Sequence, residues 1–296
     1  MLKKLNKVAK QTNIFLTSYL KNQKNTELIR PMKYGLVPGG KKIRSKILID
    51  VGKIFGINNK SLIQIGAAVE CIHAYSLIHD DLPCMDNDDL RRGKPSTHKK
   101  FGEATAVLAG NSLLTLAFEI LSNKKLKLSN DIKVKLINII SEFSGHSGIA
   151  GGQFLDLNFE KKKIPLNNII RMQIKKTAKL FIFCCVTPVL ISKKHKQINN
   201  FKKLGSDIGL LFQIVDDLID YRGSSKVAGK KTKKDLKKGK ATLINFLGYN
   251  DTLVYVDNLK NKIFNKLNKF GKKSESLKET INFIIDRERW KKKIFI

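Results

Sequence analysis

Several residue types are scarce in this sequence of 296 residues, which has only four cysteines, six prolines and one tryptophan. The cysteines, at Cys71, Cys84, Cys184 and Cys185, form neither a CxxC pair nor any spacing typical of a metal site. The sequence therefore argues against a zinc module or a disulfide-stapled fold, and we expect a reducing, cytoplasmic location. The scarcity of proline favours long helices, because proline interrupts the helical hydrogen-bond ladder.

Long hydrophobic runs are also missing. The longest run, residues 180–191, has 12 residues and contains Pro188, whereas a helix that spans a membrane needs about 20 apolar residues. Residues 1–7 lack the apolar segment of a signal peptide. We therefore expect neither a transmembrane segment nor a signal peptide.

Acidic residues are few, since 25 Asp and Glu stand against 57 Lys and Arg, and the formal net charge is +32. A non-catalytic nucleic-acid-binding protein is one class with such a charge, but it predicts clustered basic residues and aromatic stacking residues. Here the lysines are scattered and Trp290 is the only tryptophan. We interpret the charge as compositional and expect no nucleic-acid partner, although a positive field would attract a small polyanion such as a diphosphate.

The sequence contains long apolar segments with the periodicity of buried helices. Residues 61–80, 105–121 and 201–221 have little or no polar face, and sustained period-two alternation is missing throughout. Glycine, proline and polar clusters predict loops at residues 37–40, 92–95, 144–152 and 223–239. None of these loops has the length or composition of a domain boundary, so we predict an all-α fold with one domain over residues 1–296.

The scarce aspartates gather in two clusters, each at the end of a buried apolar segment. The first cluster has Asp80, Asp81, Asp86, Asp88 and Asp89. On a regular helix Asp80 and Asp86 would point about 240° apart, so they share a site only if the helix breaks, and Pro83 supplies a break.

The second cluster has Asp216, Asp217 and Asp220. Asp216 and Asp220 are four residues apart, which places both carboxylates on one helix face, and Asp217 is positioned to support them. Like charges this close together repel unless cations lie among them. Oxygen ligands without paired His or Cys suit Mg²⁺, which is usually completed by water and substrate phosphates. We therefore interpret the two clusters as halves of one divalent-cation site.

Around these clusters the chain resembles the trans (E)-isoprenyl diphosphate synthases, and within them most closely the bacterial farnesyl diphosphate synthases. The resemblance extends from about residue 32 to residue 247 in chain order. The matching elements are residues 39–44, residues 70–73, the first cluster with residues 91–93, residues 151–153 with Asp156, residues 176–177, residues 212–213 before the second cluster, and residues 229–230 with 239–240.

The resemblance implies an all-α helical bundle around a deep central cavity, normally a homodimer, that joins an allylic diphosphate to isopentenyl diphosphate. It implies that Asp80 and Asp86 bind two Mg²⁺ ions and Asp216 a third, with Asp81, Asp217 and Asp220 in support. The residues expected to contact the allylic diphosphate are Arg91, Lys176, Thr177, Gln213, Lys230 and Lys240. The residues expected to bind isopentenyl diphosphate are Lys41, Arg44, His73 and Arg92.

The expected chemistry is ionisation of the allylic diphosphate, followed by condensation and loss of a proton. Lys176, Thr177 and Gln213 are the expected catalytic residues, because the lysine neutralises the leaving diphosphate and the two side-chain oxygens stabilise the cation. The departed diphosphate is expected to remove the final proton. A lid around Lys230 is expected to exclude water, which would otherwise trap the cation.

The product and the class of enzyme have alternatives. Tyr75, five residues before Asp80, resembles the bulky residue that limits chain length in this family, and with the Pro83-Cys84 insertion it favours the fifteen-carbon farnesyl product. A geranylgeranyl diphosphate synthase is the alternative. A terpene cyclase would share the cavity and Mg²⁺ chemistry but would not need a second diphosphate site, so Lys41, Arg44 and His73 argue against it.

Overall fold

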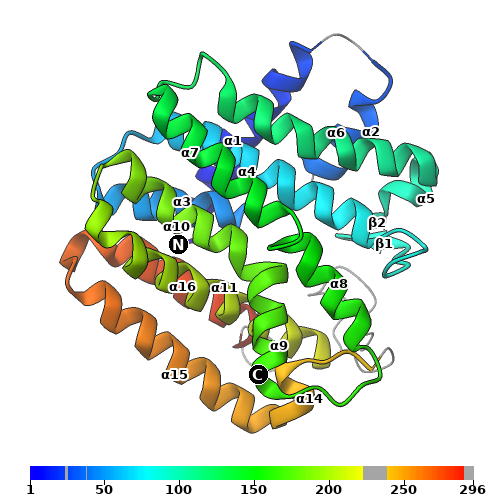
Figure 1. Cartoon of the computed structure of the whole chain (residues 1–296), viewed down its shortest axis with the longest axis vertical. Helices are drawn as coiled ribbons and strands as arrows, with labels where there is room; N and C mark the ends of the chain where they lie inside the picture. The colour runs from blue at the N-terminus through cyan, green and yellow to red at the C-terminus, as the bar shows by residue number, and fades with distance from the viewer. Residues whose placement is uncertain (24–25, 38, 223–238, 290–296) are drawn as a thin grey trace.

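The computed structural model describes residues 1–23, 26–37, 39–222 and 239–289 (Figure 1). The first half of the chain forms α1 (Leu2–Lys21), α2 (Ile29–Leu36), α3 (Ile43–Ile54), α4 (Asn59–Asp80), β1 (Leu90–Arg91), β2 (Lys94–Pro95), α5 (Thr97–Phe101), α6 (Glu103–Ser122) and α7 (Asn130–Ser144). The second half forms α8 (Ile149–Phe159), α9 (Leu166–Gln173), the π-helix η1 (Ile174–Ala178), α10 (Lys179–Ile191), the 3₁₀-helix η2 (His195–Gln197), α11 (Ile198–Tyr221), α14 (Leu243–Leu247), α15 (Tyr249–Asn268), the 3₁₀-helix η3 (Gly271–Ser274) and α16 (Glu275–Arg289).

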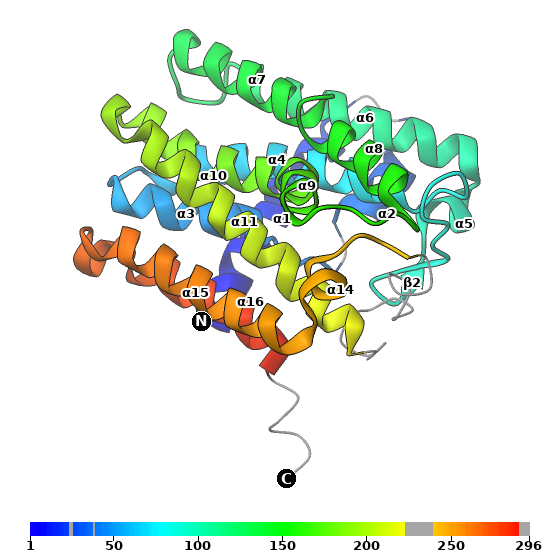
Figure 2. The same ribbon diagram turned by 60° about the horizontal axis from the view of Figure 1, so that its bottom comes forward.

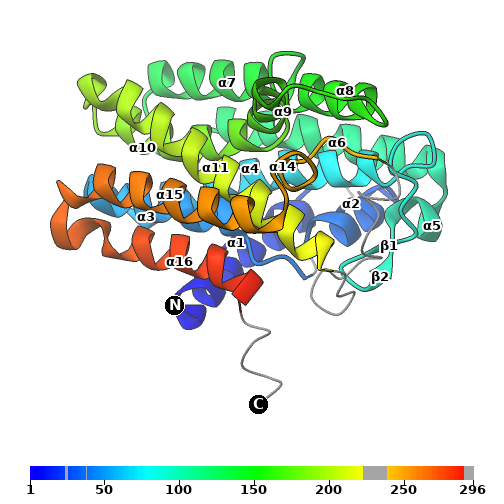
Figure 3. The same ribbon diagram turned by 90° about the horizontal axis from the view of Figure 1, so that it is seen from below.

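The helices lie in layers. Figures 2 and 3 show α7 and α8 on one outer side, α15 and α16 on the other, and α4, α10 and α11 between them. Helix α4 packs against α6 and α3, and α10 packs against α11 and α3. The predicted all-α class is confirmed, and in the described residues the only sheet is the two-stranded β1–β2 hairpin.

The three apolar segments predicted as buried helices are confirmed as α4, α6 and α11, each within three residues of its expected bounds. Helix α4 begins where the Asn58 side chain accepts a hydrogen bond from the Lys60 backbone N–H, a common N-terminal cap. Helices α4 and α11 end at the two aspartate clusters, so both clusters lie at the C-terminal ends of core helices.

The predicted loop at residues 144–152 is wrong over its last four residues, because α8 already begins at Ile149. The glycines that indicated a loop have a packing role instead. A Cβ atom on Gly152 would lie 2.2 Å from the backbone nitrogen of Lys176, so α8 and η1 cross with their backbones in contact. This close crossing brings the inner face of α8 beside residues 176 and 177.

Two described helices, α4 and α6, are long and apolar enough to cross a membrane by length and composition alone. In α4, 61% of the apolar window is buried, which is the behaviour of a core helix. In α6 the buried share is 44%, and Val107 and Leu108 remain 38% and 55% exposed. The expectation of no transmembrane segment rested on shorter apolar runs and did not anticipate the exposed apolar face of α6.

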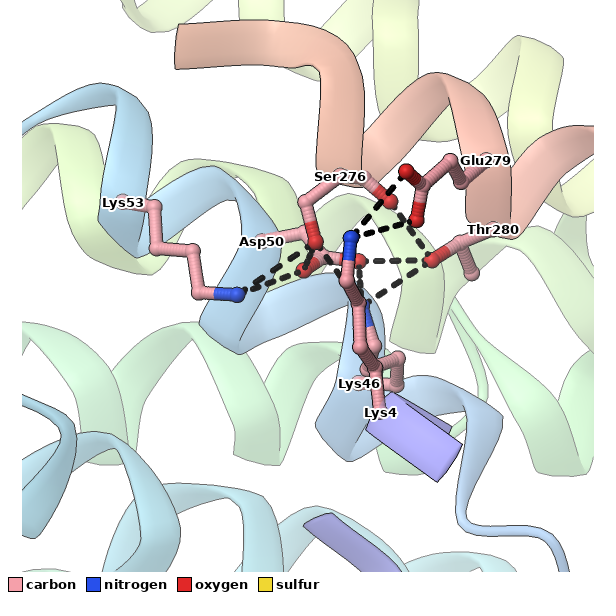
Figure 4. A network of polar contacts seen from close by, with 7 residues as sticks. All are labelled: Lys4, Lys46, Asp50, Lys53, Ser276, Glu279 and Thr280. Carbon is pink, nitrogen blue, oxygen red and sulfur yellow. Dashed lines mark hydrogen bonds and ion pairs between the residues drawn. The ribbon is translucent and has the colours of Figure 1, made fainter. Parts of the chain in front are cut away.

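A buried polar network holds α16 against α3 (Figure 4). Lys46 and Asp50, both fully buried, form an ion pair within α3. Thr280 and Ser276 of α16 donate hydrogen bonds of 2.6 and 2.7 Å to the Asp50 carboxylate. Burial lowers the pKa of Lys46, and Asp50 opposes that shift. Because every polar group here has a partner on the other helix, the network determines how α16 lies on the body.

Two ion pairs made by exposed lysines flank this network (Figure 4). Lys53 lies 3.6 Å from Asp50, and Lys4 of α1 lies 2.8 Å from Glu279 of α16. Exposed pairs of this kind contribute little to stability. The fixed position of α16 matters more, because this helix brings Phe283 and Arg287 to the wall of the central cavity.

Candidate active site

A cavity of about 620 Å³ lies at the centre of the molecule and collects the ends of many elements. Side chains from α3, α4, α8, η1, α11 and α16 line it. Asp80 and Asp86 of the first aspartate cluster line it, as do Asp216, Asp217 and Asp220 of the second. The structure therefore brings the two clusters to one cavity, although 136 residues separate Asp80 from Asp216.

The first cluster reverses direction at the end of α4. The helix ends at Asp80, and the backbone N–H of Asp86 then donates a hydrogen bond of 2.8 Å back to the carbonyl of Asp80. Pro83 lies in this turn, as the sequence predicted, and a proline disfavours helical geometry in the residue before it. The turn places Asp80 and Asp86 on the cavity wall together.

Asp81 supports this wall from behind. Its carboxylate is 2% exposed and accepts hydrogen bonds from the Arg91 Nε at 3.0 and 3.1 Å. Arg91 lies on β1 and lines the cavity. Burial raises the pKa of Asp81, and Arg91 opposes that shift. The pair therefore fixes a guanidinium beside the metal-ligand candidates, and the supporting role expected of Asp81 stays a prediction.

Burial and the nearby Lys176 shift the pKa of Asp80 in opposite directions. Burial raises its pKa to about 6, Lys176 opposes the shift, and the neighbouring Asp86 adds to it. Two carboxylates this close disfavour each other's charged forms. A cation bound between them would remove that repulsion, so the wall is suited to a divalent ion.

The second cluster forms the opposite wall on α11. Asp216 pairs with Arg287 of α16 at 2.9 Å. Both oxygens of Asp217 accept hydrogen bonds, from the Gln173 amide at 2.9 Å and the Gln213 amide at 2.7 Å. Asp220 is 5% exposed and lines the cavity. Side-chain amides thus hold Asp217, while Asp216 and Asp220 lie near the same helix end; their roles at a metal site stay predictions.

Asp156 holds two lysines and is connected through one of them to the first aspartate cluster. Its Oδ2 lies 2.6 Å from Lys176 Nζ and 3.1 Å from Lys240 Nζ, and Lys240 also lies 3.1 Å from Asp86. Burial raises the pKa of Asp156, but the two lysines outweigh burial and the net shift is downward. Asp156 belongs to one of the motifs that carry the family resemblance, but no role was predicted for it. The signal that could have indicated a role is that Asp156 is the only acidic residue in the apolar segment 149–159.

The three expected catalytic residues meet at the π-helix η1. Lys176 and Thr177 lie in its wide turn, and the Thr177 hydroxyl donates a hydrogen bond of 2.6 Å to the Gln213 side-chain oxygen. Single π-helical turns occur frequently at functional sites. The hydrogen bonds continue from Gln213 to Asp217, so the carbonyl and hydroxyl groups at this point are held in fixed orientations.

A second group of basic residues lies elsewhere on the same cavity. Lys41, Arg44, His73 and Arg92 all line it. Arg44 is 8% exposed, with its guanidinium 4.9 and 5.5 Å from the ring centroids of Phe181 and Phe212. Burial, with Arg44 and Arg92 nearby, lowers the pKa of His73 well below its usual value. This group is a concentrated positive site that needs an anion.

Glu70 and Lys42 organise this second group and were not assigned from the sequence. Lys42 has a left-handed φ of 49°, and its Nζ donates a hydrogen bond of 2.6 Å to the carbonyl of Leu36. Glu70 accepts hydrogen bonds of 3.2 Å from the backbone N–H and the hydroxyl of Ser45. Glu70 also lies 3.9 Å from Lys42 Nζ. These contacts anchor the first turn of α3, from which Arg44 projects.

Tyr75 and Lys230, two of the predicted site residues, are not among the described residues that line the cavity. Tyr75 packs edge-on against His79 at 5.1 Å and is missing from the described residues that line the cavity, whereas the neighbouring Ser76 and Leu77 are among them. Lys230 lies outside the described residues.

The carboxylates of the cavity suit Mg²⁺ if water or substrate supplies the remaining ligands. Within the described residues, no group of three or more His, Cys, Asp or Glu side chains is arranged to hold a metal ion by itself. A cation at this site would therefore complete its shell with water or with an anionic substrate. Carboxylate oxygens on two facing walls fit Mg²⁺, which binds through one or two carboxylates plus phosphates.

Comparison with known proteins identifies the family. The polyprenyl synthetase model matches residues 25–283. The farnesyl diphosphate synthase of Micrococcus luteus is 38% identical over 265 residues, which cover 89% of this chain and 90% of that protein.

Solved structures agree with that match. An FPP/GFPP synthase from Zymomonas mobilis superimposes with a TM-score of 0.86 at 36% identity, over 96% of this chain and 98% of that one. A Helicobacter pylori geranyltransferase, complexed with magnesium and isoprenyl diphosphate, gives a TM-score of 0.82 at 32% identity, over 96% of both chains. The chain therefore belongs to the polyprenyl synthetase family.

Proposed function

We propose that the protein condenses isopentenyl diphosphate with dimethylallyl or geranyl diphosphate and releases farnesyl diphosphate and diphosphate. The observation that carries this proposal is the division of the basic residues into two groups on one cavity. Lys176 and Lys240 pair with Asp156, whereas Arg44 and Arg92 interact electrostatically with Glu70 and, with Lys41, form the second group. Two anionic substrates need two such groups, whereas a hydrolase or a cyclase needs one.

The allylic diphosphate is assigned to the first group. Arg91, Lys176 and Lys240 contribute positive charge beside the aspartate walls, and Thr177 and Gln213 lie next to Lys176. Lys240 and Lys176 now share Asp156, so an arriving diphosphate finds both ammonium groups gathered at one point. Lys230 is proposed as a further contact on sequence grounds alone.

Magnesium is the proposed cofactor, with three ions per site. Asp80 and Asp86 on one wall and Asp216 on the other would hold it, with Asp81, Asp217 and Asp220 in support. When bound, Mg²⁺ neutralises the charge that develops on the leaving diphosphate. The relative from Helicobacter pylori, complexed with magnesium and isoprenyl diphosphate, supports this assignment.

Isopentenyl diphosphate is assigned to the second group. Lys41, Arg44 and Arg92 offer the charge, and a neutral His73 can donate a hydrogen bond to a diphosphate oxygen without repelling the nearby guanidiniums. The stacking of Arg44 on Phe181 and Phe212 holds its guanidinium in place before the substrate arrives.

The reaction proceeds in three steps. The bond between C1 of the allylic substrate and its diphosphate oxygen breaks, and the electron pair leaves with the diphosphate. The Thr177 and Gln213 oxygens stabilise the resulting allylic cation while the isopentenyl double bond forms a new carbon–carbon bond to C1. The new cation then loses a proton to an oxygen of the departed diphosphate, which yields a product five carbons longer.

The chain length of the product is proposed as fifteen carbons, with geranylgeranyl diphosphate as the alternative. Tyr75 is proposed to act as the floor from beside Ser76 and Leu77, which line the cavity. The change Tyr75→Ala should lengthen the products from isopentenyl and geranyl diphosphates, because the floor would recede by one aromatic ring. Product analysis by mass spectrometry checks this, and an unchanged product distribution would remove Tyr75 from this role.

We also propose that the 296 residues form one polyprenyl synthetase domain that works in the cytoplasm as a homodimer. The exposed apolar positions Val107 and Leu108 on α6 support the dimer, since a second copy would cover them.

The test of the function is a product assay with the purified protein, isopentenyl diphosphate, and dimethylallyl or geranyl diphosphate, with Mg²⁺ or with a chelator. Longer prenyl diphosphates that form only with the metal support the proposal. Hydrocarbon products would indicate a terpene cyclase instead. The absence of any turnover would favour a binding protein.

A further inference from the structure

One buried polar side chain on the cavity wall has no role in the mechanism above. Gln153 of α8 lines the cavity, is 4% exposed, and has no hydrogen-bond partner for either amide atom among the described residues. Buried polar groups are nearly always paired, because an unpaired amide costs about 1–3 kcal/mol. An amide left in this state at a reaction site points to a partner that arrives with the substrate.

The position of Gln153 along α8 defines that partner. Ile149, Gln153 and Asp156 share the inner face of the helix and all line the cavity. Asp156 holds the lysine assigned to the leaving diphosphate, and Gln153 lies three residues away, about 4.5 Å along the axis at 1.5 Å per residue. Gln153 therefore lies within one helical turn of the acid that holds this lysine, near the point where the bond to the diphosphate would break.

A contact made by the neighbouring residue places Gln153 next to the crossing of α8 and η1. The adjacent Gly152 leaves α8 in backbone contact with Lys176, since a Cβ there would lie 2.2 Å from the Lys176 nitrogen. Thr177, whose oxygen is assigned to the cation, follows directly in η1. Gln153 and Thr177 therefore flank the same crossing.

We propose that the side-chain carbonyl of Gln153 stabilises the allylic cation, as a further catalytic residue; this inference rests on the proposed synthase function. Because no group among the described residues holds the amide, its oxygen can turn toward the carbons that carry the charge. In a cavity from which water is excluded, the dipole of an amide oxygen stabilises a nearby cation far more than it would in water. The oxygen accepts no proton and forms no bond, so the reaction remains balanced as written above.

The decisive variant is Gln153→Met, which keeps the unbranched chain and removes both amide atoms. We expect kcat with geranyl and isopentenyl diphosphates to fall about tenfold or more, with both KM values within about threefold of wild type. We also expect the melting temperature to stay the same or rise, because an unpaired buried amide is lost. Hydrolysis of geranyl diphosphate without isopentenyl diphosphate should fall in parallel, since both reactions share the ionisation.

The control is Asn158→Met, which removes an exposed amide from the same helix and should leave kcat unchanged. An unchanged kcat in Gln153→Met, with a working wild type, overturns the role of Gln153 alone. A large fall in melting temperature or a failure to fold also overturns it, because the amide would then be paired within the protein. A wild type that forms no prenyl diphosphate overturns the synthase function and this role with it.

Discussion

At the scale of single residues, the site depends on carboxylates that hold lysine ammonium groups in place before the substrate binds. Asp156 is the clearest case, because it gathers Lys176 and Lys240 while its own pKa is lowered. Since Asp156 is 5% exposed, its charge is compensated within the protein and not by water.

The change Asp156→Asn should weaken this arrangement. We expect kcat to fall at least tenfold and the free energy of unfolding to drop by about 2 kcal/mol at pH 7. A carboxyl whose folded pKa is depressed stabilises the protein above the usual aspartate value of 3.8, and this stabilisation is lost as pH falls through the folded pKa. Urea unfolding of the wild type and the variant at pH 7 and at a pH below 3.8 measures the effect, and a difference that grows toward low pH would contradict it.

Lys41 tests the division into two diphosphate groups. Its ammonium lies 4.9 Å from the Phe283 ring, and burial lowers its pKa, with Arg287 adding to the shift. The change Lys41→Gln should raise the KM for isopentenyl diphosphate about tenfold and leave the KM for geranyl diphosphate within about twofold. Steady-state kinetics with each substrate varied in turn check this. Equal rises in both KM values would count against two separate groups.

At the scale of elements, the attachment of α16 to α3 controls one side of the cavity. Breaking a buried ion pair by removing one partner is costly, because it leaves the other charge uncompensated. Lys46 and Asp50 form such a pair, and the hydroxyls of Ser276 and Thr280 complete it from α16.

The change Lys46→Met should therefore lower the free energy of unfolding by about 3–5 kcal/mol, and adding Asp50→Leu should restore much of the loss. Lys53→Met is the matched control: Lys53 lies at the same aspartate but is 43% exposed, and its loss should cost under about 1 kcal/mol. Chemical denaturation of all four proteins measures these values. Equal losses for Lys46→Met and Lys53→Met would show that burial is not decisive here.

At the scale of the whole molecule, α6 carries two consecutive exposed apolar side chains, Val107 and Leu108. Helix α6 is among the most apolar helices, yet its outer side carries Leu108 at 55% exposure. A surface of this kind on a core-like helix favours contact with a second copy.

The change Leu108→Lys should convert the proposed dimer to a folded monomer, because a buried charge would enter the interface. Val254→Lys is the matched control, since Val254 is similarly exposed at 58% but belongs to a different helix, α15. Analytical ultracentrifugation, with circular dichroism for the fold, distinguishes the two. A wild type that sediments as a monomer would remove the proposal.

Much of the architecture was predictable because it depends on local patterns. The buried helices α4 and α11 could be predicted from their continuous apolar sequences. The break after Asp80 could be predicted from Pro83. The start of α8 was not, because Gly151 and Gly152 have the composition of a loop. Only the crossing with Lys176 shows that Gly152 is needed for close packing within a helix.

The sequence by itself determined the helical class, the two aspartate clusters and, through its motifs, the residues expected at the site. The tertiary structure decided which of them meet. Asp86 and Lys240 are 154 residues apart yet lie within 3.1 Å, and Asp81 turns out to hold Arg91 behind the wall. The physical reason is that helix formation depends on neighbours in sequence, whereas the pairing and burial of a charge depend on groups that only folding brings together. The role proposed for Gln153 also depends on the tertiary structure, because only the fold shows that its amide is buried without a hydrogen-bond partner among the described residues.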